Sequence, residues 1–202
     1  NVIYLLSQKE QVEFYLDFES VNMNHKTTIF QIGTLVVGES FEKYHSFIVD
    51  IIDDYEENRI IELWLTMLDH YKREFNLNST PIYHWSGAEI NLLNGFRKKL
   101  QNKLNTYYKG SITRSATRII QLINRTLDTI TNLIDNDFYD IAEVFKQNPI
   151  TIRGVFGFGL KDIANALYDE GYINSYYQLH INNNDDISNG RLAAELAIEE
   201  NN

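Results

Sequence analysis

Two carboxylates separated by one apolar residue are the part of this sequence best suited to chemistry. Asp17 and Glu19 flank Phe18 near the end of a β-rich run, 12–18. Side chains alternate along a strand, so both carboxylates would face one side of a sheet and Phe18 the other. Like charges this close repel, and a divalent cation between them would offset the cost. The pair favours a metal site; an exposed strand face carrying two acids is the structural alternative.

β-rich runs in the first third of the chain, followed by helical periodicity, would position these acids. Three runs joined by short connections predict an antiparallel meander, at 12–18, 27–37 and 44–49. The run 81–85 predicts a fourth strand. Apolar residues at helical spacing predict helices at 60–68, 88–104, 116–134, 160–170 and 188–199. The pattern predicts one α/β domain over residues 1–202.

Five short motifs occur in an order that resembles a known nuclease superfamily. They are Tyr-Leu-Asp-Phe-Glu at 15–19, Ile-Phe-Gln-Ile-Gly at 29–33, Ile-Tyr-His-Trp-Ser-Gly-Ala-Glu at 82–89, Gly-Leu-Lys-Asp-Ile-Ala at 159–164 and Asp-Ile-Ser-Asn-Gly at 186–190. Together they resemble the DEDD superfamily of metal-dependent 3′-to-5′ exonucleases, and more closely its predicted RecB-associated branch. The resemblance implies a ribonuclease H-like fold: a mixed sheet, with the antiparallel meander plus parallel strands, and helices on both faces.

The resemblance also implies four metal ligands, which would be catalytic. Asp17 and Glu19 come from the first motif, Glu89 from the helix after the fourth strand, and Asp186 from the last motif. Most members have Asp where this chain has Glu89, and a first-turn acid favoured by the helix dipole is the structural alternative. Oxygen ligands and the absence of cysteine favour two Mg²⁺ or Mn²⁺ ions over zinc.

Two other acids compete for a place in this site. Asp185 competes with Asp186, because His180 precedes it at the spacing of a His-containing variant of the family. Asp140 lies in the apolar segment 138–145 and could line the site. Both alternatives stay open at the level of the sequence.

Several residues near the motifs could contact a nucleic acid. His84 and Trp85 precede Glu89, where a ring could stack on a terminal base, and burial in the core is the alternative for the tryptophan. Lys161 follows three glycines and resembles a phosphate-contacting lysine of related nucleases; an ordinary exposed helix residue is the alternative. The densest basic strip is formed by Arg97, Lys98, Lys99 and Lys103.

Composition limits the class of protein. The chain is 44% hydrophobic and lacks cysteine, which excludes disulfides and thiolate sites and fits an intracellular protein. Its net charge of −10 argues against a module that coats nucleic acid with a broad positive surface. The apolar runs are strand-sized, so we expect no membrane partner. Because it begins with Asn1, we expect a fragment of a longer chain, whose other domains could be partners.

The motif resemblance implies a metal-dependent nuclease that hydrolyses phosphodiester bonds of DNA or RNA. We expect a two-metal 3′-to-5′ exonuclease acting on single-stranded ends. The alternative is a catalytically degenerate nuclease-fold domain that binds nucleic acid or a protein without cutting, which Glu89 in place of Asp favours.

Overall fold

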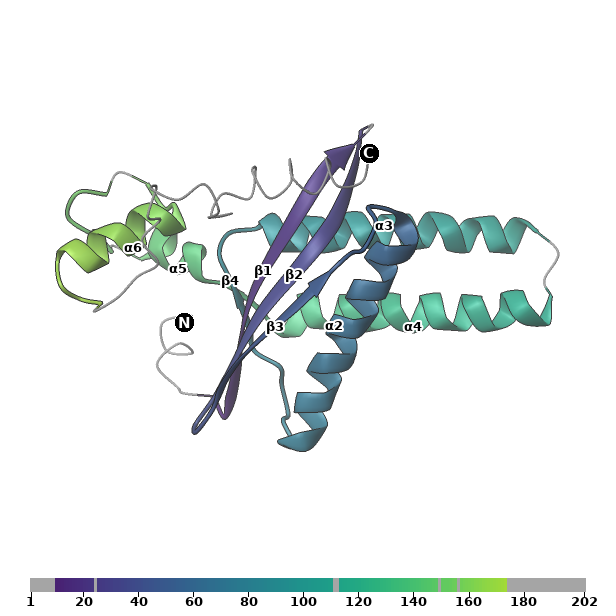
Figure 1. The fold of residues 1–202 in the computed structure, drawn as a ribbon, viewed down its shortest axis with the longest axis horizontal. Helices are drawn as coiled ribbons and strands as arrows, with labels where there is room; N and C mark the ends of the chain where they lie inside the picture. The colour runs from purple at the N-terminus through teal and green to yellow at the C-terminus, as the bar shows by residue number, and fades with distance from the viewer. Residues whose placement is uncertain (1–9, 24, 111–112, 149, 156, 174–202) are drawn as a thin grey trace. The chain divides into compact units, whose positions relative to one another are not determined.

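A computed structural model describes residues 10–23, 25–110, 113–148, 150–155 and 157–173 (Figure 1). The chain divides into two compact units. The first is Glu10–Tyr139, and the described residues from Asp140 onward belong to the second. The expectation of a single domain stays a prediction.

A five-stranded mixed sheet forms the centre of the α/β fold. Its strands are β1 (Val12–Met23), β2 (Lys26–Gly38), β3 (Glu42–Ile48), β4 (Ile82–His84) and β5 (Phe138–Asp140), in the order β3-β2-β1-β4-β5. β1 pairs antiparallel with β2, β2 pairs antiparallel with β3, and β1 pairs parallel with β4. The predicted meander and fourth strand are confirmed. β5 lies in a segment for which the sequence indicated only apolar character.

The helices follow the predicted order, except that α5 lies in a segment for which the sequence indicated only apolar character. The first unit contains α2 (Asp54–Glu74), α3 (Ala88–Lys109) and α4 (Arg114–Asn136), and the second contains α5 (Ile141–Gln147) and α6 (Leu160–Asp169). In Figure 1, α3 and α4 lie side by side as a long hairpin that extends past α2. No helix in the described ranges combines the length and apolar character needed to cross a bilayer. The predicted helix 188–199 lies outside the described residues.

The hydrophobic core of the first unit lies between the sheet and its helices. Phe14, Leu16 and Phe18 of β1 are buried there with residues of α2, α3 and α4. The Phe18 ring packs edge-on against Trp64 of α2, with ring centroids 5.6 Å apart. Asp17 and Glu19 alternate with these residues and face away from the core, as the strand period predicts.

A buried ion pair joins α2, α3 and β2. The Glu57 side chain is 1% exposed and accepts hydrogen bonds from the Ile29 amide at 2.8 Å and from Lys99 Nζ at 2.7 and 2.9 Å. Lys99 Nζ also donates to the Thr27 carbonyl at 2.6 Å. Lys99 therefore contributes to the fold, whereas the sequence indicated only that it belongs to the densest basic strip.

Candidate functional site

Asp17 lies on the sheet face opposite the core, at a point where the neighbouring strand has no side chain. Its partner on β2 is Gly33. A Cβ at Gly33 would lie 2.5 Å from the Tyr44 hydroxyl oxygen, so the tyrosine of β3 reaches across the glycine towards β1. Glycine inside a strand often marks such a close approach. The Tyr44 hydroxyl thus lies over Gly33, the residue paired with Asp17, and the sequence did not indicate this polar group.

The environment of Asp17 disfavours its charge. The side chain is solvent-accessible, yet the surrounding protein raises its pKa above the ordinary value, and the negative charge of Glu89 raises it further. Two of the four predicted ligands are therefore close enough to influence each other electrostatically. Glu19 lies on the same face and is half-buried.

Glu89 is a buried acid in the first turn of α3. Only 6% of the residue is exposed, and its Oε2 atom accepts no hydrogen bond. His84 Nδ1 lies 3.3 Å from this oxygen. A buried carboxylate oxygen that lacks a hydrogen bond is costly and calls for a cationic partner. The dipole explanation for Glu89 does not account for this burial, because a dipole-stabilised acid needs no desolvation.

His84 supports the turn before Glu89 and does not present a ring to substrate. Its side chain is 0% exposed, and its ring packs against Phe138 at a centroid distance of 5.4 Å. Nδ1 donates to the Ser86 carbonyl at 2.6 Å, and Ser86 adopts a positive φ of 75°. Such a conformation is unfavourable for a residue with a Cβ and is retained where the surroundings enforce it. The expectation that His84 stacks on a base is wrong.

Three other predicted site residues come from elements other than the one that carries Asp17. Trp85 is half-buried after β4. Lys161 is exposed in the first turn of α6, in the second unit. Asp140 caps α5, where its Oδ1 accepts from the Glu143 amide at 3.3 Å. Asp186 and its competitor Asp185 lie outside the described residues.

Three tyrosines form a row across β1, β4 and β5. The rings of Tyr15 and Tyr83 are 5.4 Å apart, and those of Tyr83 and Tyr139 are 5.6 Å apart. Burial and the negative charges of Glu13 and Glu10 raise the pKa of Tyr83 to about 12. Tyr15 precedes Asp17 by two residues and shares its sheet face. The sequence analysis missed this row, although the alternation around Asp17 could have indicated Tyr15.

Asp17 and Glu89 fit part of a divalent cation site. A cation would relieve their mutual repulsion and would give Glu89 Oε2, which accepts no hydrogen bond, a further partner. Within the described ranges, no three histidine, aspartate or glutamate side chains gather closely enough to hold an ion. Asp186, which the motif resemblance implies as a further ligand, lies outside the described residues.

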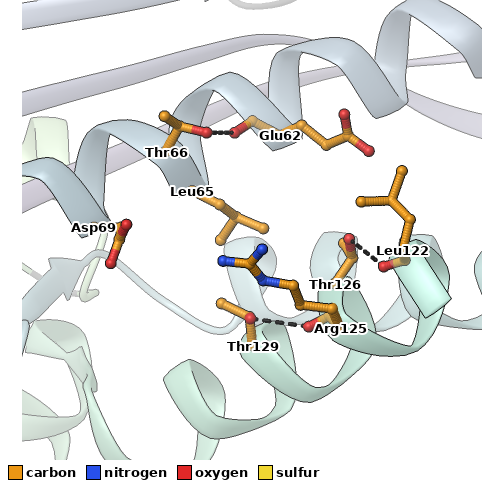
Figure 2. A pocket seen from close by; sticks show the side chains of 8 residues that line it. All are labelled: Glu62, Leu65, Thr66, Asp69, Leu122, Arg125, Thr126 and Thr129. Atoms are coloured by element: carbon orange, nitrogen blue, oxygen red, sulfur yellow. Dashed lines mark hydrogen bonds between the residues drawn. The ribbon is translucent and has the colours of Figure 1, made fainter.

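A pocket of about 260 Å³ lies elsewhere in the first unit, between α2 and α4. Figure 2 shows the Arg125 guanidinium reaching from α4 into this pocket, with Asp69 and Glu62 coming from α2. It holds none of the predicted site residues. Its lining consists of Glu62, Leu65, Thr66, Asp69, Leu122, Arg125, Thr126 and Thr129.

Comparison with known proteins adds no relative to this chain. No family model matches it, and no curated protein is significantly similar to it in sequence.

Proposed function

We propose that this protein is a metal-dependent nuclease with a ribonuclease H-like fold, which hydrolyses phosphodiester bonds at single-stranded 3′ ends of DNA or RNA. The observation that carries the proposal is the electrostatic coupling of Asp17 to Glu89, whose buried Oε2 has no hydrogen bond. The order of elements also supports it. An antiparallel meander, a parallel strand and then a helix that begins with an acid is the order that the motif resemblance implies.

In this proposal Asp17, Glu19, Glu89 and Asp186 hold Mg²⁺ or Mn²⁺. The bound ions would lower the pKa of the attacking water and stabilise the leaving 3′ oxygen. His84 keeps the turn that positions Glu89 by donating to the Ser86 carbonyl. The Tyr44 hydroxyl, which lies over Gly33, can donate a hydrogen bond to a phosphate oxygen.

A cleavage assay with a matched acid variant tests the proposal. A labelled single strand, a blunt duplex and a covalently closed circle are incubated side by side in Mg²⁺, Mn²⁺, Ca²⁺ or EDTA. We expect the wild type to cut the single strand in Mg²⁺ or Mn²⁺ only. Asp17→Asn should lose at least about 100-fold in rate, since metal ligation contributes several kcal/mol to transition-state stabilisation. Glu39→Gln, at an exposed acid after β2, should retain full activity.

Two results would contradict this proposal in different ways. Cutting of the circle as fast as the linear strand would identify an endonuclease. Absence of cutting, with Mg²⁺ binding detected by calorimetry, would support the alternative of a catalytically degenerate nucleic-acid-binding domain.

A further inference from the structure

Positive charge is concentrated in one segment of this acidic protein. Residues 90–127 contain eight Lys and Arg and no Asp or Glu. The rest of the chain has ten basic residues against all 28 acidic ones. This segment, called here the basic hairpin, makes up most of α3 and the first half of α4. Although its net charge is −10, the protein therefore has a separate region of positive charge.

Five of the eight cations are available on the surface of the basic hairpin. α3 and α4 pack together through apolar residues such as Leu104 and Ile120, which leaves the opposite sides of both helices to solvent. Within the described part of the chain, none of the five exposed cations forms an ion pair. They are Lys98, Lys103, Lys109, Arg114 and Arg118.

The other three cations of the basic hairpin already contact groups of this chain or share a pocket with its acids. Lys99 is paired with buried Glu57, and Arg97 donates to Asn94 Oδ1 at 2.9 Å. Arg125 projects into the pocket between α2 and α4, which Glu62 and Asp69 also line (Figure 2). These three cations are therefore not part of the binding surface that we propose.

The side chains around the five free cations suit a phosphate backbone better than a protein partner. Protein interfaces have an apolar centre and are depleted in lysine. Exposed neighbours in the basic hairpin are mostly amides and hydroxyls, such as Asn102, Asn105, Thr117 and Gln121. These groups, with Lys and Arg, make most protein contacts to phosphate and sugar.

The length of α3 separates this surface from the candidate site. Glu89 lies in the first turn of α3 and Lys109 is its last residue. At 1.5 Å per residue the separation is about 30 Å. A stacked strand rises 3.4 Å per nucleotide, so about nine nucleotides would span it.

We propose that the basic hairpin is a nucleic-acid-binding arm that holds the phosphate backbone of a strand about nine nucleotides from the end being cut. Binding by the arm stands without the proposed function. The nine-nucleotide length rests on the proposed function, because it is measured from Glu89.

Binding to the arm is tested without cleavage, by fluorescence anisotropy in EDTA with labelled 20-nucleotide DNA and RNA strands. The triple variant Lys109→Gln, Arg114→Gln, Arg118→Gln is compared with Lys43→Gln, Lys72→Gln, Arg73→Gln, which removes the same charge from β3 and α2. We expect the arm variant to lose about tenfold or more in affinity and its salt slope to shrink by about 2, since each phosphate contact on a single strand contributes about 0.7. Far-UV circular dichroism confirms that both variants are folded. A loss of affinity for the RNA strand alone, or for the DNA strand alone, would identify which nucleic acid the arm binds.

Equal losses of affinity in the two triple variants, or no binding by the wild type, would overturn the proposed arm.

The nine-nucleotide span is tested separately, by cleavage in Mg²⁺. The arm variant should have a higher KM than the wild type for a 20-nucleotide strand and the same KM for a 4-nucleotide strand. A higher KM for both strands would overturn the nine-nucleotide span. Arm-dependent binding in EDTA without cleavage in Mg²⁺ would disprove the proposed function and leave the arm intact.

Discussion

At the residue scale, burial has the largest effect on the pKa of Asp17, and the charge of a residue distant in sequence adds to it. The sequence indicated repulsion from Glu19, two positions away on the same strand. In the structure, burial and the charge of Glu89 raise the pKa of Asp17. Glu89 in turn stands in a helix that begins after the strained turn at Ser86. The site is thus defined by a contact between β1 and the start of α3.

Asp17→Asn should stabilise the metal-free protein at neutral pH. An acid whose pKa is raised by folding binds its proton more tightly in the folded state, so stability is lost as the pH rises above the ordinary value of 3.8. Asp17→Asn has no carboxyl group to titrate at this position, so it does not lose stability in this way. We expect a gain at pH 7 of less than about 1 kcal/mol, because the side chain is screened by solvent, and no gain below pH 3.8. Urea denaturation at both pH values measures it, and a variant less stable at pH 7 would make Asp17 a structural residue.

At the element scale, the Glu57–Lys99 pair fixes α2 and α3 on the sheet. The Glu57 carboxylate accepts hydrogen bonds both from the Ile29 amide of β2 and from the Lys99 ammonium of α3. Because α3 also carries Glu89, this pair helps to set where Glu89 stands relative to Asp17. A lysine in a run of basic residues thus serves the architecture of the site.

Lys99→Met should destabilise the fold much more than Lys98→Met. Removing Lys99 leaves the Glu57 carboxylate buried without its counter-charge, which costs about 2 to 4 kcal/mol. Lys98 is exposed, so its substitution should change the free energy of unfolding by less than about 0.5 kcal/mol. Urea denaturation monitored by tryptophan fluorescence compares the two. Equal stabilities would show that Glu57 does not depend on Lys99.

At the scale of the whole molecule, acidic and basic functions are separated along α3. The helix begins at the acids of the candidate site and ends in the basic hairpin. Under the two proposals, one helix of an overall negative protein would serve metal ions at its start and a polyanion at its end. In the proposed nuclease, Asp186 is the further metal ligand, and it lies outside the described residues.

Asp186→Asn should abolish cleavage, whereas Asp185→Asn should leave it intact. Loss of a metal ligand is expected to lower the rate at least about 100-fold. Both variants lose one negative charge at adjacent positions, so each is the control for the other. Single-turnover cleavage of a labelled strand in Mg²⁺ measures the rates. The reverse result would make Asp185 the ligand and would support a role for His180.

The sequence by itself determined the elements and the face on which Asp17 stands. Periodicity is a local property, so 2-residue alternation and 3.6-residue repeats predicted β1, β2, α3 and α4. Strand alternation likewise placed Asp17 and Glu19 away from the core. β5 was missed, because three residues are too few for a period to show.

Only the tertiary structure decided which side chains face solvent and which face one another. Lys99 and Lys98 are adjacent in sequence, yet one is paired with buried Glu57 and the other is exposed. His84 was expected to face a substrate and is instead enclosed beside Phe138. The coupling of Glu89 to Asp17 and the reach of Tyr44 over Gly33 arise between elements distant in the chain. Burial and charge coupling depend on neighbours in space, which no local pattern specifies.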